Sequence, residues 1–140
     1  MEDAQRGETR IRVLVADDHQ FLLDRVVAIL AHEFTVIGTV PDGIQLLAAE
    51  AALHPDVVVV DISMPGMTGI EAMERIRRRG SHAALVCLTA HDEDEVLQAA
   101  LEAGALGYVN KTCVAHDLVP AIHAAVEGRR VISRARLAAT

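Results

Sequence analysis

Cysteine is scarce in this sequence, and its two copies do not have the spacing of a metal or disulfide framework. Cys87 lies inside an apolar run, and Cys113 lies near an expected helix start. Neither belongs to a CxxC pair or to the mixed cysteine and histidine spacing of zinc sites. We therefore expect both to be reduced residues with a packing role.

The sequence also lacks the apolar segments that secretion or membrane insertion requires. The polar N-terminus contains no apolar core of a signal peptide. No apolar run approaches the roughly 20 residues that cross a bilayer as a helix. We expect a soluble cytoplasmic protein that does not contact membranes.

Positive charge is in short supply as well. The 13 lysine and arginine residues against 20 aspartate and glutamate residues give a net charge of −7. This balance argues against nucleic-acid binding through the field of the domain itself, so any role on DNA is expected to be indirect. The arginine cluster at residues 75–79 coincides with an expected helix end, where the helix dipole favours cations. A solvated helix terminus explains that cluster better than DNA contact.

Apolar residues make up 51% of the 140 residues, which is enough for the core of one domain. They recur in five short runs that suit buried strands, separated by segments with helical spacing. Strands that are apolar on both faces and alternate with helices predict a parallel sheet covered on both sides. The expected fold is α/β, a doubly wound (βα)5 three-layer sandwich with a five-stranded sheet in order 2-1-3-4-5, as in flavodoxin-like folds. The runs are 11–16, 34–40, 57–62, 84–88 and 106–109.

The domain is expected to span residues 11–128. Residues 1–10 are polar and expected to be disordered, and residues 129–140 are expected to form a linker or a short C-terminal helix. Pro120 lies within the last helical pattern. If that helix begins near residue 116 or 117, the proline occupies the first turn, where its missing N–H costs little.

Polar residues gather at the expected ends of four strands. Asp17 and Asp18 end the first strand, Asp61 the third and Thr89 the fourth, while the fifth runs into Lys111. These four strands are neighbours in the order 2-1-3-4-5, and ligands of open parallel sheets bind at the carboxyl ends of strands. We therefore expect these side chains to converge on one pocket. An isolated Asp-Asp pair would more often cap the following helix, and only the combination favours a binding site.

Three carboxylates in one pocket repel one another by roughly 1 to 4 kcal/mol per pair at 4 Å, unless a cation or a proton intervenes. Oxygen ligands favour Mg²⁺, which keeps coordination sites for water and phosphate oxygens. A carboxylate can then attack phosphorus because the metal screens the repulsion. A lysine ammonium and a threonine hydroxyl can each bind a phosphoryl oxygen. The predicted product is an acyl phosphate, whose hydrolysis resets the site.

In combination these motifs resemble those of response-regulator receiver domains, over roughly residues 11–128. Four motifs in the right order at the right strand ends make the resemblance specific, whereas each alone would be weak. The matching segments are Asp17-Asp18-His19, Asp61 to Gly69, Leu88-Thr89-Ala90 and Gly107 to Lys111.

The resemblance assigns a role to each residue of the pocket. It implies that Asp61 is the phospho-acceptor and that Asp17, Asp18 and Asp61 hold Mg²⁺ together with the backbone carbonyl of Ser63. It also implies that Lys111 pairs with the phosphate. The phosphoryl donor would be a phosphohistidine of a sensor histidine kinase, and small phosphodonors are further candidates.

The same resemblance implies a relay from the pocket to the surface. Thr89 would reorient towards the phosphoryl group, and Tyr108 would turn from a solvent-facing to a buried position. Tyr108 has an alternative role as an amphipathic cover on an edge strand. Ser63 and His91 are expected to flank the pocket and to influence the lifetime of the acyl phosphate. His19 lacks partners with metal-ligand spacing, so we expect it to be structural or to support the site from outside the ligand set.

The Asp-Asp-His motif, the motif intervals and the ending Glu-Gly-Arg-Arg-Val-Ile-Ser resemble the NarL/LuxR-type subfamily, which normally continues into a DNA-binding helix-turn-helix. The sequence stops at Thr140 without such a unit. We expect either a truncated regulator of transcription or a stand-alone receiver that acts by protein contacts or as a phosphate sink. A homodimer formed on phosphorylation is a further expectation.

Two rival functions are weaker. An aspartyl phosphatase of the haloacid-dehalogenase kind needs Asp-x-Asp, in which the second carboxylate is the general acid, and Ser63 occupies that place. A flavin- or nucleotide-binding module would need a phosphate-cradling loop, but neither GxGxxG nor GxxxxGK[ST] occurs. We therefore expect a signalling domain rather than an enzyme, with self-catalysed phosphotransfer and autodephosphorylation as its chemistry.

Overall fold

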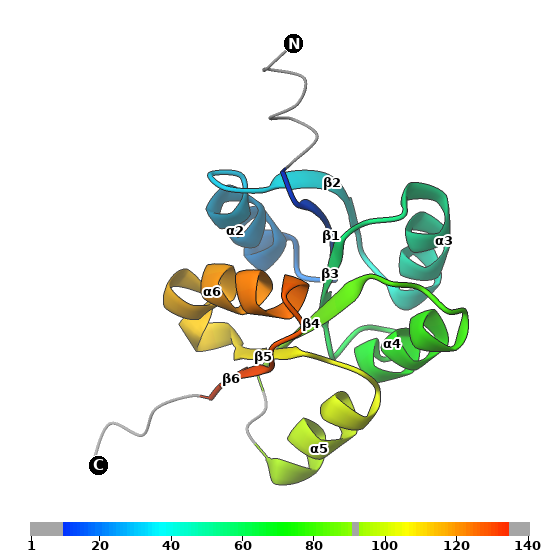
Figure 1. Ribbon diagram of the computed structural model, residues 1–140. Helices are drawn as coiled ribbons and strands as arrows, with labels where there is room; N and C mark the ends of the chain where they lie inside the picture. Colours follow the sequence, from blue (N-terminus) through cyan, green and yellow to red (C-terminus); the bar gives the residue numbers. More distant parts are fainter. Residues whose placement is uncertain (1–9, 91–92, 135–140) are drawn as a thin grey trace.

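The computed structural model describes residues 10–90 and 93–134. Strands and helices alternate along these residues (Figure 1). The elements are β1 (Arg12–Ala16), α2 (Gln20–Leu30), β2 (Thr35–Val40), α3 (Gly43–Leu53), β3 (Val57–Asp61), α4 (Gly69–Arg78), β4 (Ala84–Thr89), α5 (Asp94–Glu102), β5 (Gly107–Asn110), the 3-10 turn η1 (Lys111–Cys113), α6 (Val114–Val126) and β6 (Val131–Ser133).

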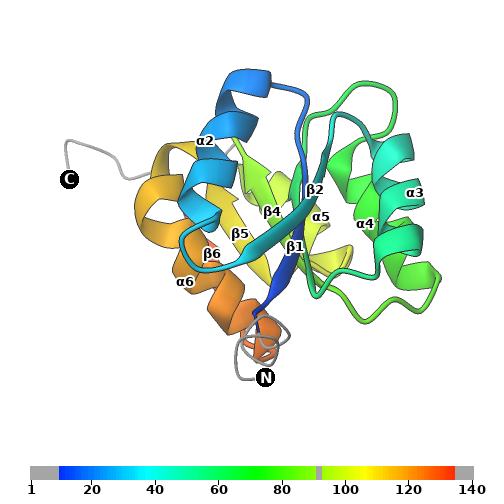
Figure 2. The ribbon, with the colours of Figure 1, turned by 90° about the horizontal axis from the view of Figure 1, so that it is seen from above.

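All strands are parallel and form one sheet in the order β2-β1-β3-β4-β5-β6. Helices α2 and α6 cover one face, and α3, α4 and α5 cover the other, as the two ribbon views show (Figures 1 and 2). Each face has its own apolar cluster, and between them β3 and β5 are buried at every residue, whereas the edge strand β2 is partly exposed. The α/β architecture and the order 2-1-3-4-5 of the first five strands are confirmed.

The number of strands, however, was predicted wrongly. Val131–Ser133 forms a sixth strand beside β5, with Tyr108 opposite Ile132. The segment 129–140, expected to be a linker or a short helix, therefore contributes a strand to the sheet. Gly128, with φ +81°, turns the chain after α6, and the Ser133 hydroxyl donates a hydrogen bond to Asp117 in that helix. A strand of three residues is too short for its period to be recognised in the sequence.

Both ends of the chain extend beyond the described residues. Residues 1–9 and 135–140 lie outside the described residues. The disorder expected for residues 1–10 therefore falls almost entirely on residues that the structure does not describe. Arg10 is described, and its guanidinium donates hydrogen bonds to the carbonyls of Ala31 and Phe34 at 3.3 and 2.9 Å.

The last helix begins earlier than the sequence predicts. Helix α6 starts at Val114, directly after η1, so Pro120 lies inside the helix rather than in its first turn. Val114 and Leu118 are buried, and their burial supports the additional turn. Proline leaves the carbonyl of His116 without its helical N–H partner. Both Pro120 and His116 are exposed, so water can satisfy that carbonyl.

Local sequence signals explain several other helix ends. The Asp42 carboxylate accepts a hydrogen bond from the backbone N–H of Gln45 at 2.8 Å and so caps α3. The Thr68 hydroxyl accepts from Glu71 N–H at 3.1 Å and caps α4. Gly80 and Gly104 follow α4 and α5 with positive φ, as expected for residues that end helices. In the part of the chain that the structure describes, no helix is long and apolar enough to cross a membrane.

Candidate functional site

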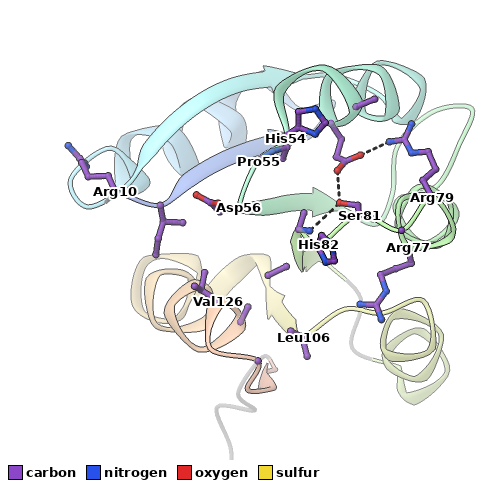
Figure 3. Close-up of a pocket in the computed structure, with 18 residues that line it drawn as sticks. Arg10, His54, Pro55, Asp56, Arg77, Arg79, Ser81, His82, Leu106 and Val126 are labelled. Atoms are coloured by element: carbon purple, nitrogen blue, oxygen red, sulfur yellow. Dashed lines mark hydrogen bonds and ion pairs between the residues drawn. The ribbon is translucent and has the colours of Figure 1, made fainter. Parts of the chain in front are cut away.

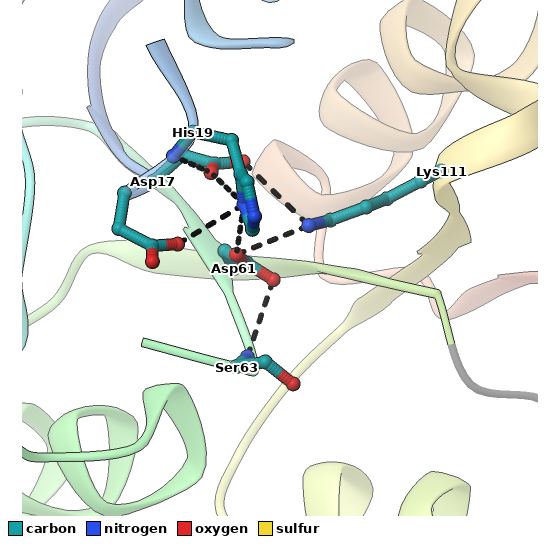
Figure 4. Close-up of polar contacts among 6 residues, drawn as sticks. Asp17, His19, Asp61, Ser63 and Lys111 are labelled. Carbon is teal, nitrogen blue, oxygen red and sulfur yellow. Dashed lines mark hydrogen bonds and ion pairs between the residues drawn. The ribbon is translucent and has the colours of Figure 1, made fainter. Parts of the chain in front are cut away.

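The predicted site residues come together at the carboxyl edge of the sheet (Figure 4). Asp17 follows β1, Asp61 ends β3 and Lys111 follows β5. The Lys111 ammonium lies 3.1 Å from Asp61 Oδ2 and 4.0 Å from Asp17 Oδ2. Both carboxylates are only 1% exposed, whereas the Asp18 side chain is 29% exposed at the mouth. The predicted convergence of the acidic residues and the lysine is therefore present.

The backbone around Asp61 holds its carboxylate in place. The Ser63 N–H donates a hydrogen bond to Asp61 Oδ1 at 3.2 Å. After the loop, the N–H of Gly69 returns to the Ile62 carbonyl at 2.8 Å. A Cβ at position 69 would collide with the carbonyl oxygen of Asp61 and lie 2.8 Å from Ile62 Cα. Glycine is therefore required where α4 begins against the end of β3.

The Asp-Asp pair does not cap helix α2. The N-cap residue of α2 is His19, which makes no side-chain capping bond. The Asp17 carboxylate instead accepts a hydrogen bond from the backbone N–H of His19 at 2.8 Å, before the helix begins. Asp17 is thus fixed by its own loop with its second oxygen directed towards Lys111 and Asp61.

The His19 ring lies among the carboxylates, and the sequence analysis missed this placement. Its Nδ1 is 3.2 Å from Asp18 Oδ1, 3.5 Å from Asp17 Oδ1 and 4.0 Å from Asp61 Oδ2. The only signal in the sequence is that His19 directly follows the acidic pair. The expectation that His19 lies outside the ligand set was based on its sequence spacing from the other histidines, and that spacing carries no information about this contact.

Burial dominates the electrostatics of Asp61. The pKa of this carboxyl is raised from 3.8 to about 6. Burial is the larger cause, and the neighbouring Asp17 carboxylate is the second. The Lys111 ammonium and the Ser63 N–H act in the opposite direction without cancelling the effect. The charged form of Asp61 is therefore less stable in this pocket than in water.

The residues present fit a small divalent cation. Among the described residues, the buried Asp17 Oδ2 accepts no hydrogen bond, and the buried Asp61 Oδ2 is approached only by the Lys111 ammonium at 3.1 Å and the His19 ring at 4.0 Å. Together with Asp18 they offer hard oxygen donors at the mouth of a pocket, which is the chemistry that Mg²⁺ prefers. That the Ser63 carbonyl completes this set stays a prediction.

Thr89 and Tyr108, the residues of the expected relay, are both buried. Thr89 ends β4 beside Asn110 in the register of the sheet, and it is 1% exposed. The Tyr108 ring is fully buried in the cluster beneath α3, α4 and α5. The alternative role of Tyr108 as cover on an edge strand is wrong, because β5 lies between β4 and β6. His91, expected to flank the pocket, lies outside the described residues.

A separate hollow of about 1200 Å³ opens at the opposite, amino edge of the sheet (Figure 3). There the buried Glu50 carboxylate accepts hydrogen bonds from Arg79 and from the Ser81 hydroxyl, both at 2.6 Å. This network joins α3 to the end of α4. None of the predicted site residues lines the hollow, so it is distinct from the acidic pocket.

Comparisons with known proteins agree on one family. Residues 13–123 match the family model of the response regulator receiver domain. The chain is 33% identical over 125 residues to the nitrate/nitrite response regulator protein NarL of Escherichia coli, covering 88% of this chain and 58% of that protein. It is 38% identical over 120 residues to the transcriptional regulatory protein LiaR of Bacillus subtilis, covering 84% and 57%.

A solved structure shows the same relationship. The signal receiver domain of the putative response regulator NarL from Mycobacterium tuberculosis superimposes with a TM-score of 0.82 at 32% identity, covering 86% of this chain and 98% of that one. The curated relatives are longer, and the chain spans somewhat less than 60% of their length. The acidic pocket, the sheet order and these similarities together show that the chain belongs to the response-regulator receiver domains of the NarL/LuxR type.

Proposed function

We propose that Asp61 accepts a phosphoryl group from a phosphohistidine of a sensor histidine kinase in a Mg²⁺-dependent reaction. The observation that carries the proposal is the buried Asp61 carboxylate, with Lys111 at 3.1 Å and an Asp17 oxygen that accepts no hydrogen bond beside it. In the transfer, a bond forms between an Asp61 oxygen and phosphorus while the bond between phosphorus and the histidine nitrogen breaks. Hydrolysis of the acyl phosphate returns the carboxylate.

Each residue of the pocket has a distinct task in this proposal. The Ser63 N–H orients the Asp61 carboxylate, and the Lys111 ammonium stabilises the negative charge of the transferred group. Asp17 and Asp18, with Asp61 and the Ser63 carbonyl, would hold Mg²⁺. The metal supplies charge neutralisation between the carboxylates and the phosphoryl oxygens.

The signal leaves the pocket through Thr89 and Tyr108. The Thr89 hydroxyl turns towards a phosphoryl oxygen, which changes the space available to the Tyr108 ring and thereby the surface formed by α5, β5 and α6. The buried ring and the interior position of its strand support the path, because β5 pairs with both β4 and β6. Ser63 and His91 would modulate the lifetime of the acyl phosphate.

The output is control of transcription through a DNA-binding domain that is not part of this chain. The naming of LiaR as a transcriptional regulatory protein supports this proposal. The domain itself would not contact nucleic acid, since its net charge is −7, and phosphorylation would favour a homodimer. A stand-alone receiver that acts by protein contacts or as a phosphate sink is the alternative. Turnover of external phosphate esters is disfavoured because Ser63 stands where a phosphatase has its acid.

Intact-mass spectrometry after incubation with Mg²⁺ and acetyl phosphate tests the proposal. We expect a labile gain of a single phosphate that is absent without Mg²⁺ and absent in Asp61→Asn. If acetyl phosphate and a panel of phosphorylated kinases all fail to label the folded native chain, or if Asp61→Asn is labelled equally, the proposal is wrong.

A further inference from the structure

The imidazole of His19 occupies a place among the carboxylates that Mg²⁺ binding alone does not require. The backbone places the residue beside the pocket, because the His19 N–H is bonded to Asp17 and the next residue begins α2. The side chain is 65% exposed, so burial does not force the ring inward. The side chain makes no capping bond to the helix either. The ring's direction is therefore set by its contacts with the carboxylates, 3.2 Å from Asp18 and 3.5 Å from Asp17.

The donor atoms lie close enough together for one metal ion to contact all of them. Around an octahedral ion with bonds of about 2.1 Å, neighbouring ligand atoms are about 3.0 Å apart and opposite ones about 4.2 Å. The three distances from His19 Nδ1 to carboxylate oxygens, 3.2, 3.5 and 4.0 Å, fall between these limits. One donor atom from each of Asp17, Asp18, His19 and Asp61 lies within 4.8 Å of all the others.

A second observation points to a cation between these groups. Asp17 and Asp61 are each 1% exposed, and the buried Asp17 Oδ2 accepts no hydrogen bond from the described residues, whereas Asp61 Oδ2 has only the Lys111 ammonium at 3.1 Å. Lys111 provides one positive charge against three carboxylates. The pocket therefore has both an excess of negative charge and a nitrogen donor in position.

The geometry points to a mixed nitrogen and oxygen site, in which His19 Nδ1 joins Asp17, Asp18 and Asp61 to bind a divalent transition ion such as Co²⁺, Ni²⁺ or Zn²⁺ more tightly than Mg²⁺. Imidazole is a good ligand for these ions, whereas Mg²⁺ selects oxygen ligands. The inference rests on the proposed function only in sharing its pocket, because ion binding requires no phosphoryl transfer.

Titrations with Co²⁺ and with Mg²⁺ at one fixed pH, followed by calorimetry and by the visible absorption of Co²⁺, test this site. We expect the native protein to prefer Co²⁺ by about tenfold or more, and His19→Ala to lose about tenfold of its Co²⁺ affinity while its Mg²⁺ affinity changes less than about threefold. His82→Ala, which changes an exposed histidine at the opposite edge, serves as the matched control and should retain both affinities. Circular dichroism checks that each variant is folded.

Three results would overturn the inference: equal losses for both ions in His19→Ala, a rise in Mg²⁺ affinity with unchanged Co²⁺ binding, or an equal Co²⁺ loss in His82→Ala. The second result would mean that the ring only covers the pocket. Labelling of Asp61 by acetyl phosphate with Mg²⁺ is measured on the same samples. If Asp61 is labelled but His19→Ala does not change the preference for Co²⁺ over Mg²⁺, only this inference is wrong. If His19→Ala changes that preference but Asp61 is not labelled, only the proposed function is wrong.

Discussion

At the scale of single residues, Asp61 combines a chemical task with an energetic cost. Its carboxylate is buried beside Asp17, and burial is the larger cause of its raised pKa. A nucleophile in such a place is more stable protonated than ionised at mildly acidic pH. The ionised form that phosphoryl transfer needs is therefore the form that the fold tolerates less well.

We predict that the Asp61 carboxyl makes the metal-free protein more stable as the pH falls from about 7 to about 4. The folded pKa of Asp61, about 6, exceeds the unfolded value of 3.8, so the stabilisation is complete below the unfolded pKa and is lost as the pH rises through 6. The effect is at most about 3 kcal/mol. Chemical denaturation in EDTA at several pH values measures it. Asp61→Asn should be more stable than the native protein at pH 8, and its stability should change less with pH. If its stability changes with pH as in the native protein, Asp61 is not the cause of the pH dependence.

Gly69→Ala tests the contact between α4 and the end of β3. The added methyl group would collide with the backbone of Asp61 and Ile62, so we expect a loss of about 1–3 kcal/mol in unfolding free energy and slower labelling of Asp61. Gly66→Ala is the matched control in the same loop, because a Cβ there has nothing within 4 Å and only the positive φ of 78° opposes it. Equal effects of the two changes would exclude the close approach as the reason.

At the scale of elements, β6 is a strand made by tertiary contacts rather than by its own sequence. Its three residues pair with β5, and Ser133 bonds to Asp117 in α6. Arg134, directly after the strand, forms an ion pair at 3.0 Å with Asp94, the first residue of α5. The strand is thus attached to both helices that flank β5.

Ser133→Ala should loosen β6 selectively. The hydrogen bond to the Asp117 carboxylate is charge-assisted, and its loss leaves that group less satisfied, at a cost of about 1–3 kcal/mol. Hydrogen exchange of the amides of residues 131–133 should accelerate while β1 and β3 remain protected. Glu127→Ala, which removes an exposed ion pair with Arg129, is the control and should change little. Unchanged exchange in β6 would mean that strand pairing alone holds it.

Pro120→Ala should stabilise α6. The alanine restores an N–H for the His116 carbonyl and has a higher helix propensity than proline. We expect this gain in free energy to exceed the loss that comes from the greater conformational freedom of the unfolded chain without proline. We expect a gain of about 1–2 kcal/mol, a few degrees in melting temperature for a domain of this size. Differential scanning calorimetry measures it. A lower melting temperature would show that the proline fits the helix without strain.

At the scale of the whole molecule, Mg²⁺ should stabilise the fold by binding only the folded pocket. At a concentration one hundred times the dissociation constant the gain is about 2.7 kcal/mol. Thermal unfolding with increasing MgCl₂ should show a rising midpoint, and Asp18→Asn should weaken the response because its more exposed carboxylate is removed from the ligand set. NaCl at matched ionic strength is the control. A response that Asp18→Asn leaves intact would place the ion elsewhere.

The sequence predicted the features that follow from topology. Asp17, Asp61 and Lys111 converge because parallel strands end at one edge, and this rule needs no knowledge of side-chain packing. The position of the His19 ring, by contrast, depends on a rotamer that the surrounding carboxylates select. The β6 strand and the interior position of β5, which excludes Tyr108 as cover on an edge strand, were missed for a related reason, since β5 becomes an interior strand only when residues 131–133 pair with it. The early start of α6 at Val114 depends on the burial of Val114 and Leu118. The sequence pattern did not predict it because Pro120 favoured a later start.

Because the sheet is parallel and each helix returns against it, the helices begin at the edge that carries Asp17, Asp18 and Asp61 and end at the edge that carries Arg77 and Arg79. The positive ends of the helix dipoles thus meet the carboxylates, and the negative ends meet the arginines. Backbone and side-chain charge are arranged as two opposed electric moments along the strand direction. A phosphoryl group on Asp61 would replace the single carboxylate charge by about two negative charges, at one end only. The net moment of the domain would then change, and its preferred orientation towards a charged partner would change together with its chemistry.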